Sequence, residues 1–106
     1  MARRDRILHA VVFARVFDLI EANGKPVEYR DPESPVGRAA LAGGYHSIRF
    51  QRAFHRVGPT VPTTVRRITR VDVGPAEPKW TLGVLEPGRE WVRIWFEEIN
   101  NSKENT

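Results

Sequence analysis

The chain has 106 residues with 17 Lys and Arg, 13 Asp and Glu and no cysteine, which gives a net charge of +4. This length suits one domain and is short for two. Without cysteine the chain has no disulfides, thiolate metal sites or cysteine nucleophiles, and a reducing compartment is favoured. No apolar run approaches the roughly 20 residues that span a bilayer, and the basic start before Ile7 does not lead into a good signal peptide. We therefore expect a cytoplasmic protein with no membrane partner.

Positive charge is concentrated in the middle of the chain. Between Ser34 and Val71 there is no acidic residue, but there are seven arginines: Arg38, Arg49, Arg52, Arg56, Arg66, Arg67 and Arg70. A GC-rich genome would explain why arginine outnumbers lysine 14 to 3, but it would not remove the acids. Because a one-sided positive field attracts polyanions, this stretch predicts an anion-binding face.

The first half of the chain predicts strands alternating with two short helices. Apolar, β-branched residues favour a strand over Ile7–Val12, and a helical period follows, with apolar residues at Phe13, Val16, Phe17 and Ile20. Asn23-Gly24 should end that helix, and a strand over Lys25–Arg30 should end at Asp31-Pro32.

A second helix and a third strand are expected next. Ser34-Pro35 should begin the helix, which runs through Arg38 and Leu41 and which Gly43-Gly44 should end. Tyr45–Arg52 then predicts a strand that has His46, Ile48 and Phe50 on one face.

The second half of the chain predicts strands separated by turns. His55–Pro62 should be a loop, and Thr63–Val73 a long strand with arginines on both faces. Gly74–Pro78 should form a turn, Trp80–Leu85 a short strand and Glu86–Arg89 a tight turn. The last strand, Glu90–Ile99, should turn Val92, Ile94 and Phe96 inward and Trp91, Arg93 and Trp95 the other way.

These elements predict an α+β fold that is mainly β, a small barrel of five or six strands with one or two helices. Closing the sheet would remove its exposed edges. We expect one domain over residues 1–99 and a polar, disordered tail over residues 100–106.

The segment from Phe17 to Asp31 holds a helix, a glycine turn and a charged strand, with Lys25, Glu28 and Arg30 at fixed spacing. It resembles the GxKxxExR signature of the ASCH domain family, a branch of the PUA-like barrels. Asn23 stands in place of the first glycine, and asparagine also tolerates a left-handed backbone. The matched register covers about 25 residues.

The resemblance implies a PUA-like barrel with a cleft between the first helix and the sheet, and a role linked to RNA. Some members of similar length look like amidohydrolases that remove the acetyl group of N4-acetylcytidine. In those enzymes the motif lysine is the base, helped by a threonine where this chain has Glu28 and by a downstream glutamate. The stretch after Val73 is too short for the helix that carries that glutamate.

We therefore predict an RNA- or nucleotide-binding domain, and hydrolysis of an acylated nucleoside is the alternative. Lys25 and Glu28 are the candidate catalytic residues. The candidate ligand-binding residues are Arg30, Tyr45, His46, Arg49, Arg66, Arg67 and Arg70. A purely structural arrangement is also open, in which Glu28 and Arg30 pair at the barrel end while Lys25 lies in solvent.

Two further alternatives concern aromatic and metal-binding side chains. Trp91 and Trp95 could stack bases, pack under the first helix, or contact a second copy or another protein. The histidines His9, His46 and His55 lack metal-site spacing, and no phosphate-loop or nucleophile-elbow motif occurs. We expect no metal and no cofactor.

Overall fold

A computed structural model describes residues 6–53, 60–80 and 88–98. Five strands, two α-helices and one short 3-10 helix make up this part of the chain. In chain order they are β1 (Ile7–Val12), α1 (Ala14–Glu21), β2 (Val27–Arg30), α2 (Pro35–Ala42), β3 (Ser47–Arg52), β4 (Thr63–Pro75), η1 (Pro78–Trp80) and β5 (Glu90–Phe96).

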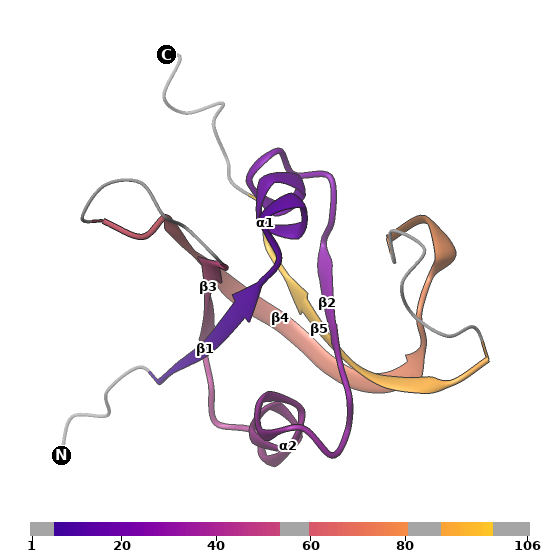
Figure 1. Ribbon diagram of the computed structural model, residues 1–106. Helices are drawn as coiled ribbons and strands as arrows, with labels where there is room; N and C mark the ends of the chain where they lie inside the picture. The colour runs from indigo at the N-terminus through magenta and orange to yellow at the C-terminus, as the bar shows by residue number, and fades with distance from the viewer. Residues whose placement is uncertain (1–5, 54–59, 81–87, 99–106) are drawn as a thin grey trace, which may run out of the picture.

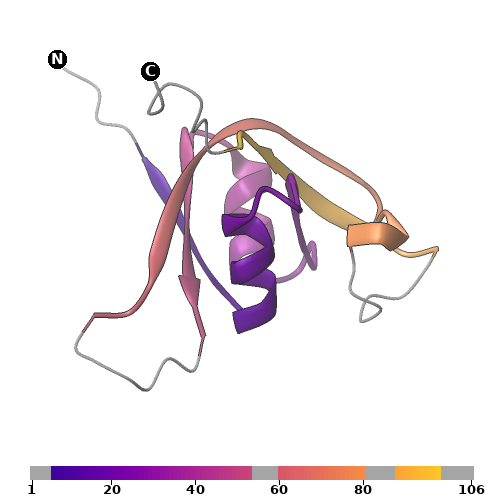
Figure 2. The ribbon, with the colours of Figure 1, turned by 90° about the horizontal axis from the view of Figure 1, so that it is seen from above.

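The five strands form one sheet in the order β1-β3-β4-β5-β2. Strands β1 and β3 run parallel, and the other three pairs are antiparallel. The sheet is curled into a half-barrel, and both helices lie on its concave side (Figures 1 and 2). The two strands at the ends of the sheet, β1 and β2, are therefore brought towards each other.

The curl of the sheet comes largely from β4. Its first half pairs with β3 and its second half with β5, and the register shifts between Ile68 and Arg70. A bulge bends a strand and increases its twist. Strand β4 therefore passes from one half of the sheet to the other, and Figure 2 shows the bend that results.

The main core fills the concave side of the sheet. Ile48, Phe50, Val92 and Ile94 are fully buried there, and α1 contributes residues such as Ile20. The alternation of buried and exposed residues along β1 and β3 is what a half-buried sheet requires. A second, smaller cluster on the other side of β2 and β5 contains Val27, Tyr29 and Trp91.

Local sequence signals explain both helices. Helix α1 ends before Asn23. The φ of Asn23 is 58°, a left-handed value that is common where a helix ends. Ser34 caps the start of helix α2, and its Oγ accepts a hydrogen bond from the Gly37 N–H at 3.0 Å. Gly37 permits a close approach, because a Cβ there would lie 2.1 Å from the Asp31 carbonyl oxygen.

The α+β, mainly β prediction is confirmed, as are both helices and the inward and outward faces of β5. Several predicted boundaries are wrong. Strand β2 begins at Val27 and not at Lys25, and β5 ends at Phe96, before the predicted Ile99. Gly74 and Pro75 continue β4, since they pair with Trp91 and Glu90. Trp80 belongs to η1, in which its N–H donates to the Glu77 carbonyl at 2.9 Å. His46 precedes β3 and is exposed.

Several predictions fall on residues that the structure does not describe. They are most of the loop at 55–62, the strand residues 81–85, the start of the turn at 86–89, and the tail at 100–106. In the described part of the chain, no helix combines the length and the apolar character needed to cross a membrane.

Candidate functional site

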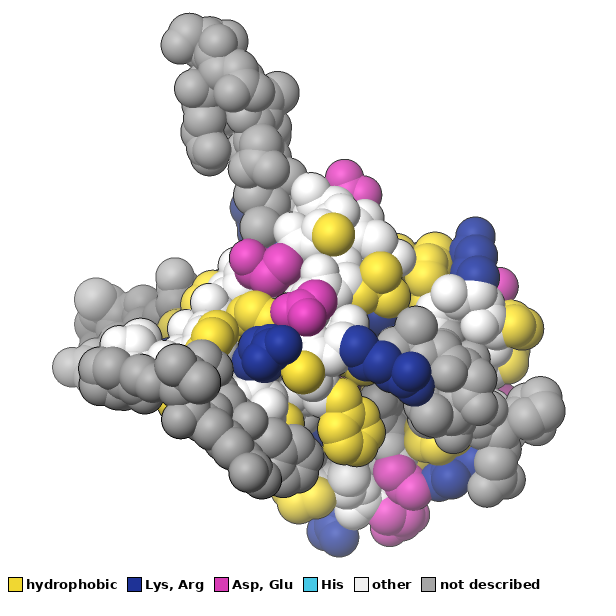
Figure 3. Space-filling model, turned by 45° about the horizontal axis from the view of Figure 1, so that its top comes forward, with side chains coloured by type: hydrophobic (Ala, Val, Ile, Leu, Met, Phe, Trp, Pro, Cys, Tyr) yellow, Lys and Arg dark blue, Asp and Glu magenta, His cyan; other side chains and the backbone are white. Residues whose placement is uncertain are grey.

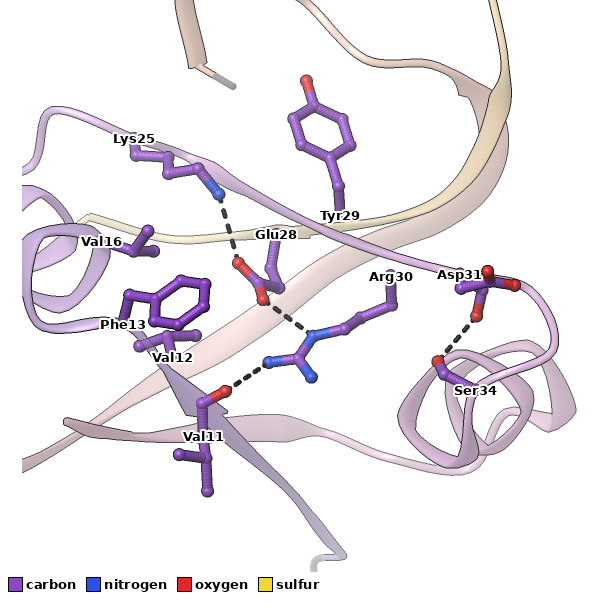
Figure 4. Close-up of a pocket in the computed structure, with 10 residues that line it drawn as sticks. All are labelled: Val11, Val12, Phe13, Val16, Lys25, Glu28, Tyr29, Arg30, Asp31 and Ser34. Atoms are coloured by element: carbon purple, nitrogen blue, oxygen red, sulfur yellow. Dashed lines mark hydrogen bonds and ion pairs between the residues drawn. The ribbon is translucent and has the colours of Figure 1, made fainter. Parts of the chain in front are cut away.

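A pocket of about 420 Å³ lies where the two end strands of the sheet approach each other. Its walls come from β1, the start of α1, β2 and the turn before α2, as Figure 4 shows. The lining residues are Val11, Val12, Phe13, Val16, Lys25, Glu28, Tyr29, Arg30, Asp31 and Ser34. A continuous run of sequence from Lys25 to Asp31 thus meets the first strand and helix around one hollow.

Three charged side chains form a connected chain in this pocket. Lys25 Nζ lies 3.2 Å from Glu28 Oε1, and Arg30 Nε lies 2.8 Å from Glu28 Oε2. A second nitrogen of Arg30 donates to the Val11 carbonyl at 2.9 Å, so Arg30 bridges β2 and β1 (Figure 4). Lys25 and Glu28 are each only 5% exposed. Arg30 therefore links the two edges of the sheet and orients the shared carboxylate at the same time.

The position of Lys25 depends on the turn that precedes β2. Strand alternation places Glu28 and Arg30 on the concave side, while Val27 and Tyr29 join the outer cluster. Strict alternation would turn Lys25 away from Glu28, but the strand begins only at Val27. The chain before the strand rotates Lys25 to the pocket side, and the arrangement with Lys25 in solvent is absent.

Two aromatic residues contribute to the pocket walls in different ways. The Phe13 side chain is 64% exposed, although its spacing predicted a place on the buried face of α1. It precedes the helix at the cap position and therefore lies outside the helical period. Burial raises the pKa of Tyr29, whose hydroxyl accepts a hydrogen bond from the Glu77 N–H at 2.9 Å. Tyr29 is thus a neutral wall residue.

The rim of the pocket is fixed by Asp31. The Glu33 N–H and the Arg89 guanidinium both donate to its carboxylate and hold its pKa below the usual value. The Ser34 hydroxyl donates to the Asp31 carbonyl at 2.7 Å. These contacts tie the rim to α2 and to the residues just before β5.

Three arginines of the acid-free stretch are paired with acids from outside it. Arg52 contacts Asp18 at 3.3 Å, and Arg70 contacts Asp72 at 3.1 Å. Arg66 is buried, and its guanidinium donates to the Ile20 carbonyl at the end of α1 and lies 3.5 Å from Glu21. Such burial favours a structural role for Arg66 over a phosphate contact.

On the surface shown in Figure 3, cationic and anionic side chains are interspersed. Strand pairing and the fold bring acids next to arginines that are remote from them in sequence. An acid-free stretch of sequence therefore does not by itself make an acid-free surface.

The remaining predicted binding residues lie apart from the pocket. Arg49 and Arg67 are exposed on the outer face of β3 and β4. Tyr45 is partly buried against the main core, and the Arg6 guanidinium lies 4.4 Å from its ring centroid. His46 is exposed, and its backbone N–H donates a hydrogen bond to the Arg6 carbonyl. The structure thus brings Lys25, Glu28 and Arg30 together in the pocket. Arg49, Arg67, Tyr45 and His46 all lie outside it.

The tryptophans of β5 are engaged within the fold. Trp91 is 7% exposed and packs with Val27 and Tyr29. Trp95 is partly buried, with its ring centroid 6.0 Å from that of Trp80, and its Nε1 donates to Asp72 at 3.3 Å. Both tryptophans thus pack within the fold, but on the outer side of β2 and β5, so the alternative that placed them under the first helix is wrong.

Sequence reasoning missed the Val11 carbonyl, the exposed Phe13 ring and the Asp31 rim. The pair Asp31-Pro32 was visible only as the end of a strand, and no sequence signal shows which backbone carbonyl an arginine meets.

Within residues 6–53, 60–80 and 88–98, no cluster of three or more His, Asp and Glu side chains could hold a metal ion.

Comparisons of the chain with protein-family models, curated proteins and solved structures find no match.

Proposed function

We propose that the chain is an RNA- or nucleotide-binding domain of ASCH type that holds a base in the pocket between β1 and β2. The observation that carries the proposal is the buried Lys25–Glu28–Arg30 chain at the wall of a mostly apolar hollow. Small-molecule sites typically occupy roughly 300 to 1,000 Å³ and combine apolar walls with a few convergent polar groups. The pocket has this size and this composition.

The charges in the pocket are better explained by a ligand than by stability. Burying ions has a large desolvation cost, and well-packed apolar residues of similar volume often stabilise a protein as well or better. The charged groups also retain hydrogen-bonding capacity. Within the described residues, Glu28 accepts two hydrogen bonds, whereas a carboxylate offers about four lone-pair sites.

A nucleobase suits these groups. Its edge presents donors and acceptors side by side, and carboxylates accept from the amino group of cytosine. The ammonium of Lys25 and the guanidinium of Arg30 offer donors to the ring and carbonyl acceptors. The exposed Phe13 ring at the pocket supplies an apolar face on which a base can stack. The cysteine-free composition favours the cytoplasm as the place of this activity.

Titration of the full chain with the four nucleoside 5′-monophosphates, followed by NMR or calorimetry, tests the proposal. Phe13→Leu keeps an apolar side chain and removes the ring. We expect it to weaken binding by about 1 to 3 kcal/mol, while Leu41→Ala, a change at another exposed apolar residue, has no effect. Absence of binding to all four nucleotides would refute a nucleotide pocket.

The buried position of Lys25 also supports a second candidate, hydrolysis of an acylated nucleoside with Lys25 as base. However, Lys25 Nζ is already paired with Glu28 at 3.2 Å, and the stretch after Val73 is too short for the helix that carries the downstream glutamate of the amidohydrolases. Binding is therefore preferred. Chromatography of N4-acetylcytidine after incubation with wild type and Lys25→Ala decides the matter, because turnover by wild type alone would establish the enzyme.

A further inference from the structure

The outer face formed by β1, β3 and the part of β4 that pairs with β3, Thr63 to Arg67, has no acidic side chain at any of its paired positions. Strand pairing arranges its residues in three rows, with His9 opposite Arg49 and Arg49 opposite Val65 in the middle row. The outer rows contain Ile7, Ser47 and Arg67 at one end and Val11, Gln51 and Thr63 at the other. Every charged or titratable side chain of this face is therefore a cation or a histidine.

Arg49 and Arg67 on this face differ from three other arginines of the acid-free stretch. In the described chain no carboxylate pairs with Arg49 or Arg67, whereas Arg52, Arg66 and Arg70 each pair with one. Ser47 is the residue opposite Arg67, so Arg49 and Arg67 are diagonal neighbours, with Cα atoms roughly 7 to 8 Å apart. Two guanidinium groups at this separation can contact neighbouring phosphates of one strand.

A small hollow lies on this face beside the edge strand β1. Its volume is about 150 Å³, and His9, Val11, Arg49 and Gln51 contribute to its lining. Val11 also lines the larger pocket on the other side of β1. Neighbouring strands lie only about 5 Å apart, so a ligand that crosses the end of β1 can reach both hollows.

We propose that the ligand is single-stranded RNA that crosses β1, with one base in the pocket and the adjoining phosphates on the outer face at Arg49 and Arg67. The inference rests on the proposed function of the pocket and adds a path for the strand. The base must be unstacked to enter a pocket, which a single strand permits and a duplex resists.

The test compares nucleotides with RNA on the same protein. Wild type, Arg49→Gln, Arg67→Gln and the control Arg15→Gln are titrated with the 5′-monophosphates and with labelled oligo(U), oligo(C) and oligo(A) of about eight nucleotides at several salt concentrations. Arg15 is exposed on α1, so the control substitution removes one positive charge at a site away from the sheet face. A fully paired RNA duplex is the second control.

We expect a single-stranded oligonucleotide to bind more tightly than its monophosphate and than the duplex. Arg49→Gln and Arg67→Gln should each reduce the steepness of log affinity against log salt by about 0.7. Between 1 M and 0.1 M salt, the affinity of each variant should therefore rise about five-fold less than that of wild type. Arg15→Gln should leave the slope unchanged.

Each other outcome has a distinct meaning. If monophosphates bind in the pocket but the two arginine variants behave like Arg15→Gln, the path is wrong and the pocket stands. Equal affinity for duplex and single strand would also overturn the path. If neither monophosphates nor oligonucleotides bind, the proposed function itself fails and the inference fails with it.

Discussion

Glu28 and Asp72 lie on opposite sides of the curled sheet, and each carboxylate contacts two cations. Asp72 also accepts from Trp95, so that within the described residues its two oxygens receive four hydrogen bonds or ion-pair contacts. Glu28 receives two. Because a carboxylate offers about four lone-pair sites, Asp72 is saturated by the protein, while Glu28 has capacity left for a ligand.

The surroundings of the two carboxylates differ in the same sense. Arg93 lies across Gly74, where a Cβ would be 2.6 Å from the guanidinium carbon, and no room remains between them. Glu28 instead borders a pocket of about 420 Å³. The same two-cation arrangement thus serves packing at Asp72 and leaves an accessible, charged hollow at Glu28.

The largest effect is expected from Glu28→Gln. The Glu28 side chain is 7% exposed and neutralises two cations, so its loss leaves both of them near the interior without a counter-charge. We expect the free energy of unfolding at pH 7 to fall by about 3 kcal/mol, measured by urea denaturation. Glu33→Gln, at an exposed position, is the control. If Glu28→Gln lowered the free energy of unfolding by less than Asp72→Asn does, the contrast between the two carboxylates would be wrong.

Asp72→Asn should have a smaller, pH-dependent effect. Hydrogen bonds from Arg93 hold the pKa of Asp72 below its usual value. A carboxyl group with a lowered folded-state pKa stabilises the protein above its unfolded pKa of about 4 and loses this contribution as the pH falls through the folded value.

We therefore expect Asp72→Asn to cost about 1 to 2 kcal/mol at pH 7, with a difference from wild type that shrinks below about pH 4. Thermal unfolding at a series of pH values measures it. Asp18→Asn, which removes a more exposed ion pair, should cost less at every pH. A difference that grew on acidification would mean that the Arg93 contact is absent in solution.

The sequence predicted most of the fold because its signals are local. The alternation in β1 and β3, the left-handed Asn23 and the cap at Ser34 each depend on a few neighbouring residues. The order of the strands and the bend of β4 depend on pairings between distant segments, and no local pattern states them.

The candidate site was only partly predictable for the same reason. Lys25, Glu28 and Arg30 are close in sequence, and their grouping is local. The contact of Arg30 with Val11 and the pairing of Arg66 with the end of α1 join segments 19 and 46 residues apart. Counting charges along the chain therefore could not separate Arg70, which pairs with Asp72, from Arg67, which pairs with no acid of the described residues.

Arg70→Gln provides the smallest and most discriminating change. Its side chain is 59% exposed and contacts Asp72 at 3.1 Å, so that solvent screens the pair. We expect the free energy of unfolding to fall by about 0.5 kcal/mol or less, measured by urea denaturation at low and high salt.

The counterpart in the pocket, Arg30→Gln, should lower the free energy of unfolding by about 1 to 2 kcal/mol, because Arg30 is 21% exposed and also donates to the Val11 carbonyl. Equal losses would mean that Arg30 contributes nothing across the gap between β1 and β2, and the pocket would then lack the side chain that keeps its two edges together.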